Sequence, residues 1–345
     1  MNSKRPVAPE GFDENSRQIA VWTGEPSPSG RSTRVRLILG LVWCSIGSAF
    51  IPLAPVISNV LVAFGMSIVM GGRGRREQVL ALLVSLVSGA ASTAVLFGAM
   101  SVPSTVLSVL CTFALAREYT LDRLSTTGLL LVIAATSLAM IGVDVVSASS
   151  QGTSVTELIT GVVNEAVEMS VDSLDLDETA SLLESRDAMV AYWPTLYFLV
   201  GAGTALFSLL GARLAGRIVG SRASEGFLLR YDVPLWVAEL FALGVAIELL
   251  GPLVPAWQRE TAMVGANVVM ITRIALMQQG LSVLTWRMRE RHVAGPLRVL
   301  ATLSALWLEL SFALTSIVGL ADVVFNFRHL RRNRPSVKIG PTGER

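Results

Sequence analysis

The chain has 345 residues, of which 52% are hydrophobic and only 16% are charged. Its mean hydropathy of +0.58 is too high for an ordinary soluble domain, in which about 25% of the residues are charged. The net charge of +2 says little as a sum, because the charges are segregated along the chain and their placement decides orientation. We expect a membrane protein with no nucleic-acid partner.

Hydrophobic runs about as long as a bilayer is thick recur between Leu37 and Phe327. A helix needs ~20 apolar residues, at ~1.5 Å each, to cross the hydrocarbon core. Only internally hydrogen-bonded backbone is stable there. The pattern therefore predicts an all-α, polytopic transmembrane helix bundle of about nine to ten spans. Residues 1–33 are polar and contain no apolar signal-peptide core, which favours a disordered cytoplasmic tail.

Residues 34–146 are predicted to form the N-terminal transmembrane helices. The run Leu37–Met70 is too long for one span, and Pro52 and Pro55 interrupt it. It is therefore expected to form two short helices joined by a tight turn. Three further spans follow, at about 79–97, 102–116 and 129–146. Arginines flank this set on the side that the positive-inside rule assigns to the cytoplasm.

Residues 147–191 form the long polar connection, with nine acidic residues and one basic residue, Arg186. This composition fits an outer acidic segment. Apolar residues between Val155 and Ala166 recur at helical spacing, which predicts an amphipathic helix. Such a helix either rests on the membrane or the bundle, or acts as a lid over a site. Asp175 and Glu178 have the spacing of a capping box for a second short helix.

Residues 192–328 are predicted to be the C-terminal transmembrane helices, followed by a basic cytoplasmic tail at 329–345. The last apolar stretch, Leu297–Phe327, would export that tail if it were a single span. We therefore expect a second short hairpin there, with a tilted helix followed by an interfacial one as the alternative. Both termini are then cytoplasmic, in a multi-pass protein of the cell membrane.

Charged side chains at bilayer depth cost on the order of 3 kcal/mol each, so they usually face a partner or a polar cavity. Glu239 and Glu248 lie nine residues apart on one span, ~180° apart on the helix. One is therefore expected to pair with Arg273 on the next span. Two interpretations stay open: a salt bridge that fixes helix packing, or a pocket in which Arg273 holds an anionic group. The candidate ligand-binding residues are Glu239, Glu248, Arg273, Gln278, Gln279 and Glu309.

The sequence offers no set of residues for catalysis, a metal or a cofactor. Cys44 and Cys111 lie within apolar runs, and the two histidines are far apart. The segment Gly71–Arg76 lacks the GxxxxGK[ST] spacing of a phosphate-binding loop. We therefore expect that the chain is not an enzyme and that it uses no cofactor.

Four short motifs follow Trp193-Pro194 along the C-terminal half. They are Tyr231-Asp232-Val233-Pro234-Leu235-Trp236, Gln278-Gln279-Gly280-Leu281, Gly319-Leu320-Ala321-Asp322 and Phe325-Asn326-Phe327-Arg328. With them, the chain from about Leu37 to Arg328 resembles the YybS-like family of polytopic bacterial membrane proteins. The residues that carry the resemblance are Pro234, Trp236, Gly280, Asp322, Phe327 and Arg328.

The helical domain of that family is similar to the substrate-capture subunits of energy-coupling-factor transporters. Those subunits bind vitamins or metal ions and borrow an ATPase and a membrane coupling subunit. The resemblance implies a small-molecule binding or transport component without its own ATPase, whose partners are the lipid bilayer, a small ligand and such subunits. The alternative is a membrane scaffold or regulator without a ligand pocket, in which the charges pair mutually and the basic tail from Arg328 binds a cytoplasmic partner or anionic lipid.

Overall fold

A computed structural model describes residues 30–71, 74–171, 176–219, 231–253 and 258–330. Most of both predicted tails, 1–33 and 329–345, lies outside these ranges, and so does Asp175 of the predicted capping box. Within them the regular structure is helical, with twelve α-helices and two short 3-10 helices. The α-helices are α2 Gly30–Phe50, α3 Pro55–Met70, α4 Arg75–Phe97, α5 Val102–Thr120, α6 Thr126–Ser150, α7 Val155–Val171, α8 Leu176–Ala191, α9 Trp193–Val219, α11 Leu235–Leu250, α12 Gln258–Glu290, α13 Gly295–Phe312 and α14 Leu314–Phe325.

Five described helical segments are long and apolar enough to cross a membrane: Arg75–Phe97, Ala99–Thr120, Thr126–Ser150, Trp193–Ile218 and Thr261–Glu290. The bent pair α13 and α14 makes a sixth when it is counted as one span. The predicted apolar segments all lie in helices, but α2, α3, α11, α13 and α14 are not counted as spans on their own. The fold is thus an all-α bundle, as expected for a polytopic membrane protein.

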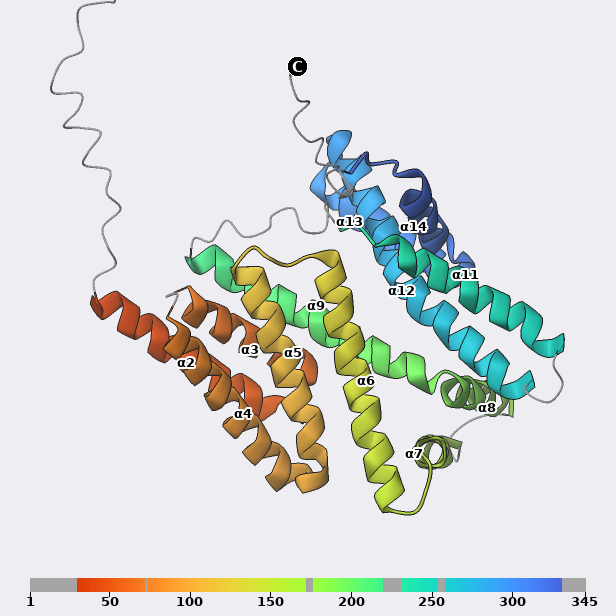
Figure 1. The fold of residues 1–345 in the computed structure, drawn as a ribbon, viewed down its shortest axis with the longest axis horizontal. Coiled ribbons are helices and arrows are strands. Elements are labelled where there is room, and N and C mark those ends of the chain that lie inside the picture. Colours follow the sequence, from red (N-terminus) through yellow and green to blue (C-terminus); the bar gives the residue numbers. More distant parts are fainter. Residues whose placement is uncertain (1–29, 72–73, 172–175, 220–230, 254–257, 331–345) are drawn as a thin grey trace, which may run out of the picture.

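The N-terminal helices α2 to α6 pack together with α9 (Figure 1). The predicted hairpin is confirmed, because α2 ends at Phe50 and Pro55 occupies the first turn of α3. Glycines let these helices approach closely. A Cβ atom at Gly65 would lie 2.6 Å from the carbonyl oxygen of Gly40, and one at Gly211 of α9 would overlap the carbonyl oxygen of Val60. Small residues at helix contacts are how membrane helices gain close packing.

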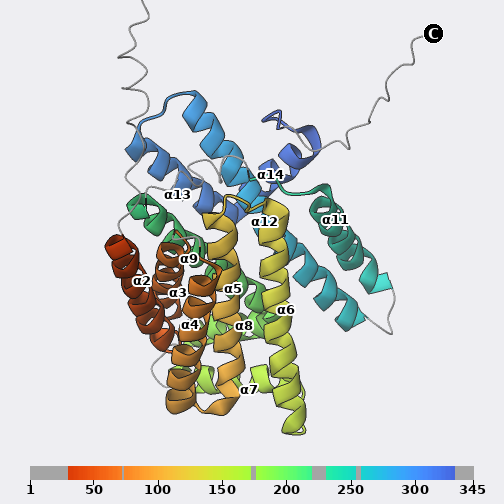
Figure 2. The same ribbon diagram turned by 60° about the vertical axis from the view of Figure 1, so that its left-hand side comes forward.

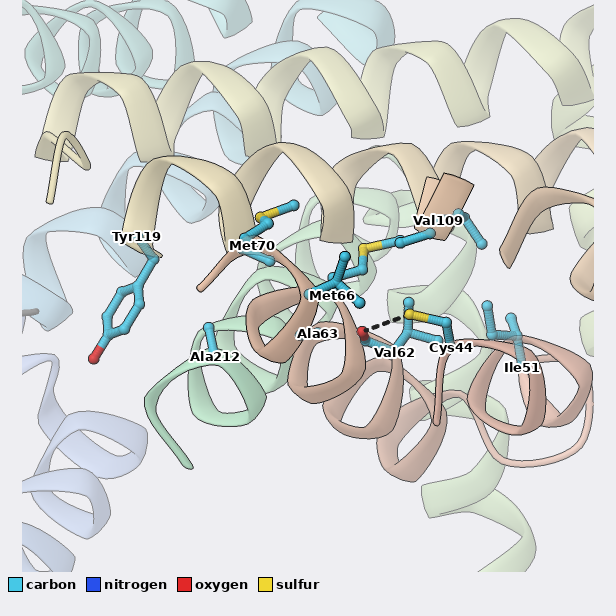
Figure 3. Close-up of a cluster of buried hydrophobic side chains, with 12 residues drawn as sticks. Cys44, Ile51, Val62, Ala63, Met66, Met70, Val109, Tyr119 and Ala212 are labelled. Atoms are coloured by element: carbon cyan, nitrogen blue, oxygen red, sulfur yellow. Dashed lines mark hydrogen bonds between the residues drawn. The ribbon is translucent and has the colours of Figure 1, made fainter. Parts of the chain in front are cut away.

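The core of this bundle is apolar, and polar side chains pair beside it. Figure 3 shows Met66 of α3 among Cys44, Val62 and Val109, all of which are buried. Nearby, the Asn59 side-chain oxygen accepts hydrogen bonds from Ser108 and Thr112 of α5, at 3.1 and 3.4 Å. The Thr112 hydroxyl also pairs with Ser208 of α9, at 2.9 Å. All four side chains are buried, and their bonds link α3, α5 and α9.

The C-terminal helices are organised around α12, against which α11 and α14 pack (Figures 1 and 2). A Cβ atom at Gly280 would overlap the carbonyl oxygen of Thr315, and one at Gly319 would overlap that of Leu276. The helices α12 and α14 therefore touch backbone to backbone. Asn267 joins α12 to the start of α9, since its side-chain oxygen accepts from the N–H and hydroxyl of Thr195 at 3.1 and 2.7 Å.

The last apolar stretch breaks between α13 and α14, where Ala313 adopts a left-handed conformation with φ +54°. The bend is 98°. A hairpin would reverse the chain, so the predicted second hairpin is wrong. The reason is that the start of α14 is tied back to α13: the Thr315 hydroxyl donates to the carbonyl oxygen of Ala305 at 2.9 Å, and Ser316 bonds to Glu309.

The acidic connection folds into α7 and α8, which pack against each other. Figure 1 shows both helices nearly end-on while α6 lies along the page, and Figure 2 shows them running across the bundle. The amphipathic helix predicted from Val155 is thus confirmed as α7.

Candidate functional site

An ion pair joins α12 to α13 within the apolar C-terminal half. The Arg273 Nε donates to Oε1 of Glu309 at 2.7 Å, and Nη2 donates to the backbone carbonyl oxygen of Glu309 at 2.6 Å. The side chain of Glu309 is 5% exposed and that of Arg273 is 27% exposed. Where water is excluded, a charge of either sign is tolerated only beside such a partner.

The same carboxylate caps α14. The N–H of Ser316 donates to Oε2 of Glu309 at 2.8 Å, and its hydroxyl donates to Oε1 at 2.6 Å. A carboxylate at a helix N-terminus satisfies an otherwise unpaired N–H and interacts favourably with the helix dipole. Glu309 therefore holds α12, α13 and α14 together at the break.

A second ion pair lies between α14 and the residues that follow it. The Arg328 Nε and Nη2 lie 3.0 and 2.9 Å from Oδ2 of Asp322, and Nη2 also donates to the carbonyl oxygen of Tyr231 at 2.7 Å. Both charged side chains are fully buried. The scaffold alternative assigned the basic tail from Arg328 to a cytoplasmic partner or anionic lipid, and for Arg328 itself this assignment is wrong, because its side chain is buried. The left-handed turn at Asn326, with φ +51°, reverses the chain and returns Arg328 to Asp322.

Gln279 of α12 completes this second cluster and is itself fully buried. Its Nε2 donates to Oδ2 of Asp322 at 2.7 Å and reaches Oδ1 of Asp232 at 3.3 Å. Its Oε1 accepts from the N–H of Val233 at 3.0 Å. The N–H of Asp232 in turn donates to the Thr126 hydroxyl at 3.1 Å. The cluster thus links α12, α14, the segment before α11 and the start of α6.

The structure divides the predicted ligand-binding residues between these clusters. Arg273 and Gln279 are six residues apart on α12, ~9 Å along the axis and ~120° around it, and they bond to different partners. The structure therefore does not place Arg273 and Gln279 together in one pocket, as was predicted. Gln278 is partly buried beside them.

Glu239 and Glu248 are both exposed on α11, and the ionic partner of Arg273 is Glu309. The predicted pairing of Arg273 with a glutamate of α11 is therefore wrong. The reason is rotational: α11 buries Val237, Ala238 and Gly244 instead. A Cβ atom at Gly244 would lie 2.9 Å from Val268 of α12, so this face of α11 leaves no room for a long side chain.

The motif residues have distinct structural roles. Asp322 and Arg328 form the buried pair, Gly280 lies at the contact of α12 with α14, and Pro234 is the extended residue before α11. Trp236 and Phe327 are exposed, and Phe327 stacks on Phe325 with ring centroids 5.8 Å apart.

Three polar residues of the clusters were not predicted from the sequence: Thr126, Asp232 and Ser316. Asp232 lies in the motif Tyr231–Trp236, and this position was the only sign in the sequence that it belongs to the site. Ser316 had none, because a hydroxyl inside an apolar run is ordinary in a membrane helix.

Comparisons with known proteins locate the chain in one family. Neither the comparison with curated proteins nor that with solved structures gave a match. A family profile covers residues 41–323. This range contains Arg273, Glu309 and Asp322, and Arg328 lies beyond it. The profile ends at α14 and spans the apolar helices described above, so it supports a multi-pass membrane protein in contact with lipid. The chain belongs to this family, which is described as predicted membrane protein (DUF2232).

Proposed function

We propose that the chain is a small-molecule binding or transport component of the cell membrane, similar to a substrate-capture subunit, with no ATPase or catalytic activity of its own. The observation that carries the proposal is the broken pair α13 and α14, whose break is occupied by Arg273, Glu309 and Ser316. Many membrane transporters bind their substrates at helices that are interrupted within the bilayer. A charged residue at that depth marks a functional site by default.

Arg273 supplies the recognition chemistry in this proposal. A guanidinium has five N–H donors in a fixed fork, and the contacts with Glu309 engage Nε and Nη2. The side chain is more exposed than that of its partner, at 27% against 5%. The remaining donors are thus available to an anionic group, such as a carboxylate or phosphate, that reaches the break from outside the cluster.

The test is native mass spectrometry of the protein purified in mild detergent, with Arg273→Gln and Arg287→Gln compared with the unmodified chain. Arg287 is a matched control on the same helix, because it is exposed and its partner Glu290 is exposed too. We expect a co-purified small anion that is lost only from Arg273→Gln. The melting temperature of this variant should fall, because Glu309 stays buried without its arginine, so the comparison is made on protein that still elutes as a folded species. Equal retention in all three proteins would refute the role of Arg273.

A second candidate, a membrane scaffold or regulator, is favoured by one observation: Arg273 pairs with Glu309 and Arg328 with Asp322, and the second of these pairs is fully buried. Affinity purification from native membranes separates the two functions. Near-stoichiometric recovery of an ABC-type ATPase and a coupling subunit supports the transport component. Recovery of only envelope or regulatory proteins supports the scaffold.

The proposed orientation places both termini in the cytoplasm. For the N-terminus it is supported by arginines at the starts of α2 and α4 and at the ends of α5, α9 and α12, in contrast to the acidic α7 and α8. For the C-terminus it requires that the bent pair α13 and α14 enters and leaves the membrane on the same side. Reporter fusions at each terminus test it: an alkaline phosphatase fusion should be inactive and a green fluorescent protein fusion should be bright. The reverse result at either terminus would overturn the orientation.

A further inference from the structure

The helix α7 presents an uncovered apolar stripe. Val162 is 61% exposed and Met169 is 74% exposed, and Ala166 lies exposed between them. These positions are spaced by four and three residues, so they share one face of the helix. Val155, at the start of the same face, is buried against the protein. This apolar face is therefore buried at the start of α7 and exposed along its C-terminal half.

The opposite side of α7 is acidic. Glu157 and Glu168 lie ~180° from Ala166, and Glu165 lies at the edge of the stripe. The helix contains no lysine or arginine. A narrow apolar stripe opposite a charged face is typical of a helix that lies in the plane of a membrane interface.

The start of α7 is fixed close to the end of a membrane span. Only residues 151–154 separate it from α6, which is long and apolar enough to cross the bilayer. Ser154 and Glu157 form a capping box: the Glu157 carboxylate accepts from the N–H and hydroxyl of Ser154 at 2.8 and 2.9 Å, and the N–H of Glu157 donates to the Ser154 hydroxyl at 3.2 Å. The chain therefore turns sharply after the span.

The turn sets the direction of α7, which lies across the direction of α6: Figure 1 shows α7 nearly end-on beside the end of α6, and Figure 2 shows it from the side. Val145 and Val146, in the last turns of α6, are themselves exposed and apolar. The stripe of α7 thus begins beside a surface that faces lipid, at the level where α6 leaves the hydrocarbon core.

We propose that α7 is an interfacial helix whose stripe of Val162, Ala166 and Met169 inserts into the outer leaflet of the membrane that the bundle crosses. The lipid it prefers has a zwitterionic headgroup, because the carboxylates of Glu157, Glu165 and Glu168 repel anionic headgroups and no basic residue of α7 attracts them. The inference is independent of the proposed transport function, since its observations come from α6 and α7, and only the choice of the outer leaflet rests on the proposed orientation.

The test uses nitroxide labels on single cysteines in the full chain, reconstituted into phosphatidylcholine vesicles. Val162→Cys and Met169→Cys probe the stripe, and Gly161→Cys and Glu168→Cys are matched neighbours on the other side. A side chain at Gly161 meets open space, so this control is not expected to disturb the fold. The native Cys44 and Cys111 are buried, and the unmodified chain serves as the labelling control.

The measurement is the collision rate of each label with oxygen, which concentrates in lipid, and with a nickel chelate, which stays in water. We expect the oxygen-to-nickel ratio to be several-fold higher at 162 and 169 than at 161 and 168, since an interfacial helix inserts its apolar face ~5–10 Å. Adding phosphatidylglycerol should make the labels at 162 and 169 shallower.

Three outcomes would overturn the proposal. High nickel access at all four positions would place the stripe in water. Exclusion of both reagents at 162 and 169 would mean that protein covers it, and Ala166→Cys would check this at a third position. Deeper insertion in the anionic vesicles would reject the preference for zwitterionic lipid.

Discussion

The buried pair of Arg328 and Asp322 allows a quantitative prediction. Arg328→Met removes the guanidinium contacts at 2.9 and 3.0 Å to Asp322 and the hydrogen bond at 2.7 Å to Tyr231, and retains an apolar chain of similar length. The Asp322 carboxylate stays fully buried, with Gln279 still donating to it. Leaving one member of a buried ion pair behind typically costs about 3–5 kcal/mol, so we expect a loss of that size in the free energy of unfolding.

The assay is reversible unfolding of the purified protein in mixed micelles of increasing sodium dodecyl sulfate content, followed by circular dichroism. The double variant Arg328→Met with Asp322→Asn removes both charges, and it should regain about 0.5–3 kcal/mol over the sum of the single changes. Arg287→Met is the matched control: this arginine and Glu290 are about half exposed, and such pairs contribute about 0–1 kcal/mol.

The reasoning would be refuted by either of two results. A loss below about 1 kcal/mol for Arg328→Met would mean that the pair is not buried in the folded protein. Strict additivity in the double variant would mean that the two side chains do not interact.

The other predictions concern helix contacts and α7. Gly319→Ala should lower the free energy of unfolding by about 1–3 kcal/mol, because its Cβ would overlap a carbonyl oxygen of α12. The control Gly142→Ala, in open space on α6, should be neutral or stabilising. Equal effects of the two substitutions would refute the close contact. Asn267→Ala should cost about 1–3 kcal/mol in the same assay, since it leaves buried groups of α9 unpaired; an unchanged midpoint would argue against this joint. Hydrogen bonds from the backbone N–H and hydroxyl of Ser154 hold the pKa of Glu157 below its ordinary value of 4.5. Because the pKa is lowered in the folded state, this stabilisation is present above pH ~4.5 and is lost as the pH falls through the lowered pKa. The protection of the amides in the first turn of α7 against hydrogen exchange, relative to their intrinsic rates at each pH, should fall there, and Glu157→Gln should abolish the pH dependence of this protection.

The sequence predicted the features that depend on one helix at a time. Pro52 and Pro55 marked the break between α2 and α3, because proline ends one helix and begins the next. The helical spacing of the apolar residues after Val155 predicted α7. The depth of Arg273 in its helix was also readable, since depth follows from counting residues along a span.

Features that depend on how helices rotate against each other could not be predicted. Depth alone made Glu239 and Glu248 as suitable for Arg273 as Glu309, and the small residues that α11 buries against α12 decided the outcome. The sequence around the break at Ala313 contains neither proline nor glycine, so its position could not be predicted from local residues. Its cause is the tertiary contact of Glu309 with Ser316.

The contact of α12 with α14 determines which parts of this half can move. Along the twelve residues of α14, ~18 Å in length, Ser316 bonds to Glu309 and lies near Arg273, Gly319 rests on the backbone of α12, and Asp322 bonds to Gln279. Three attachments spaced one turn apart prevent α14 from sliding or rotating on α12. The two helices therefore move as one body, together with the end of α13 that Glu309 ties to them. One place where this body is attached to the N-terminal helices is the joint with α9 at Asn267.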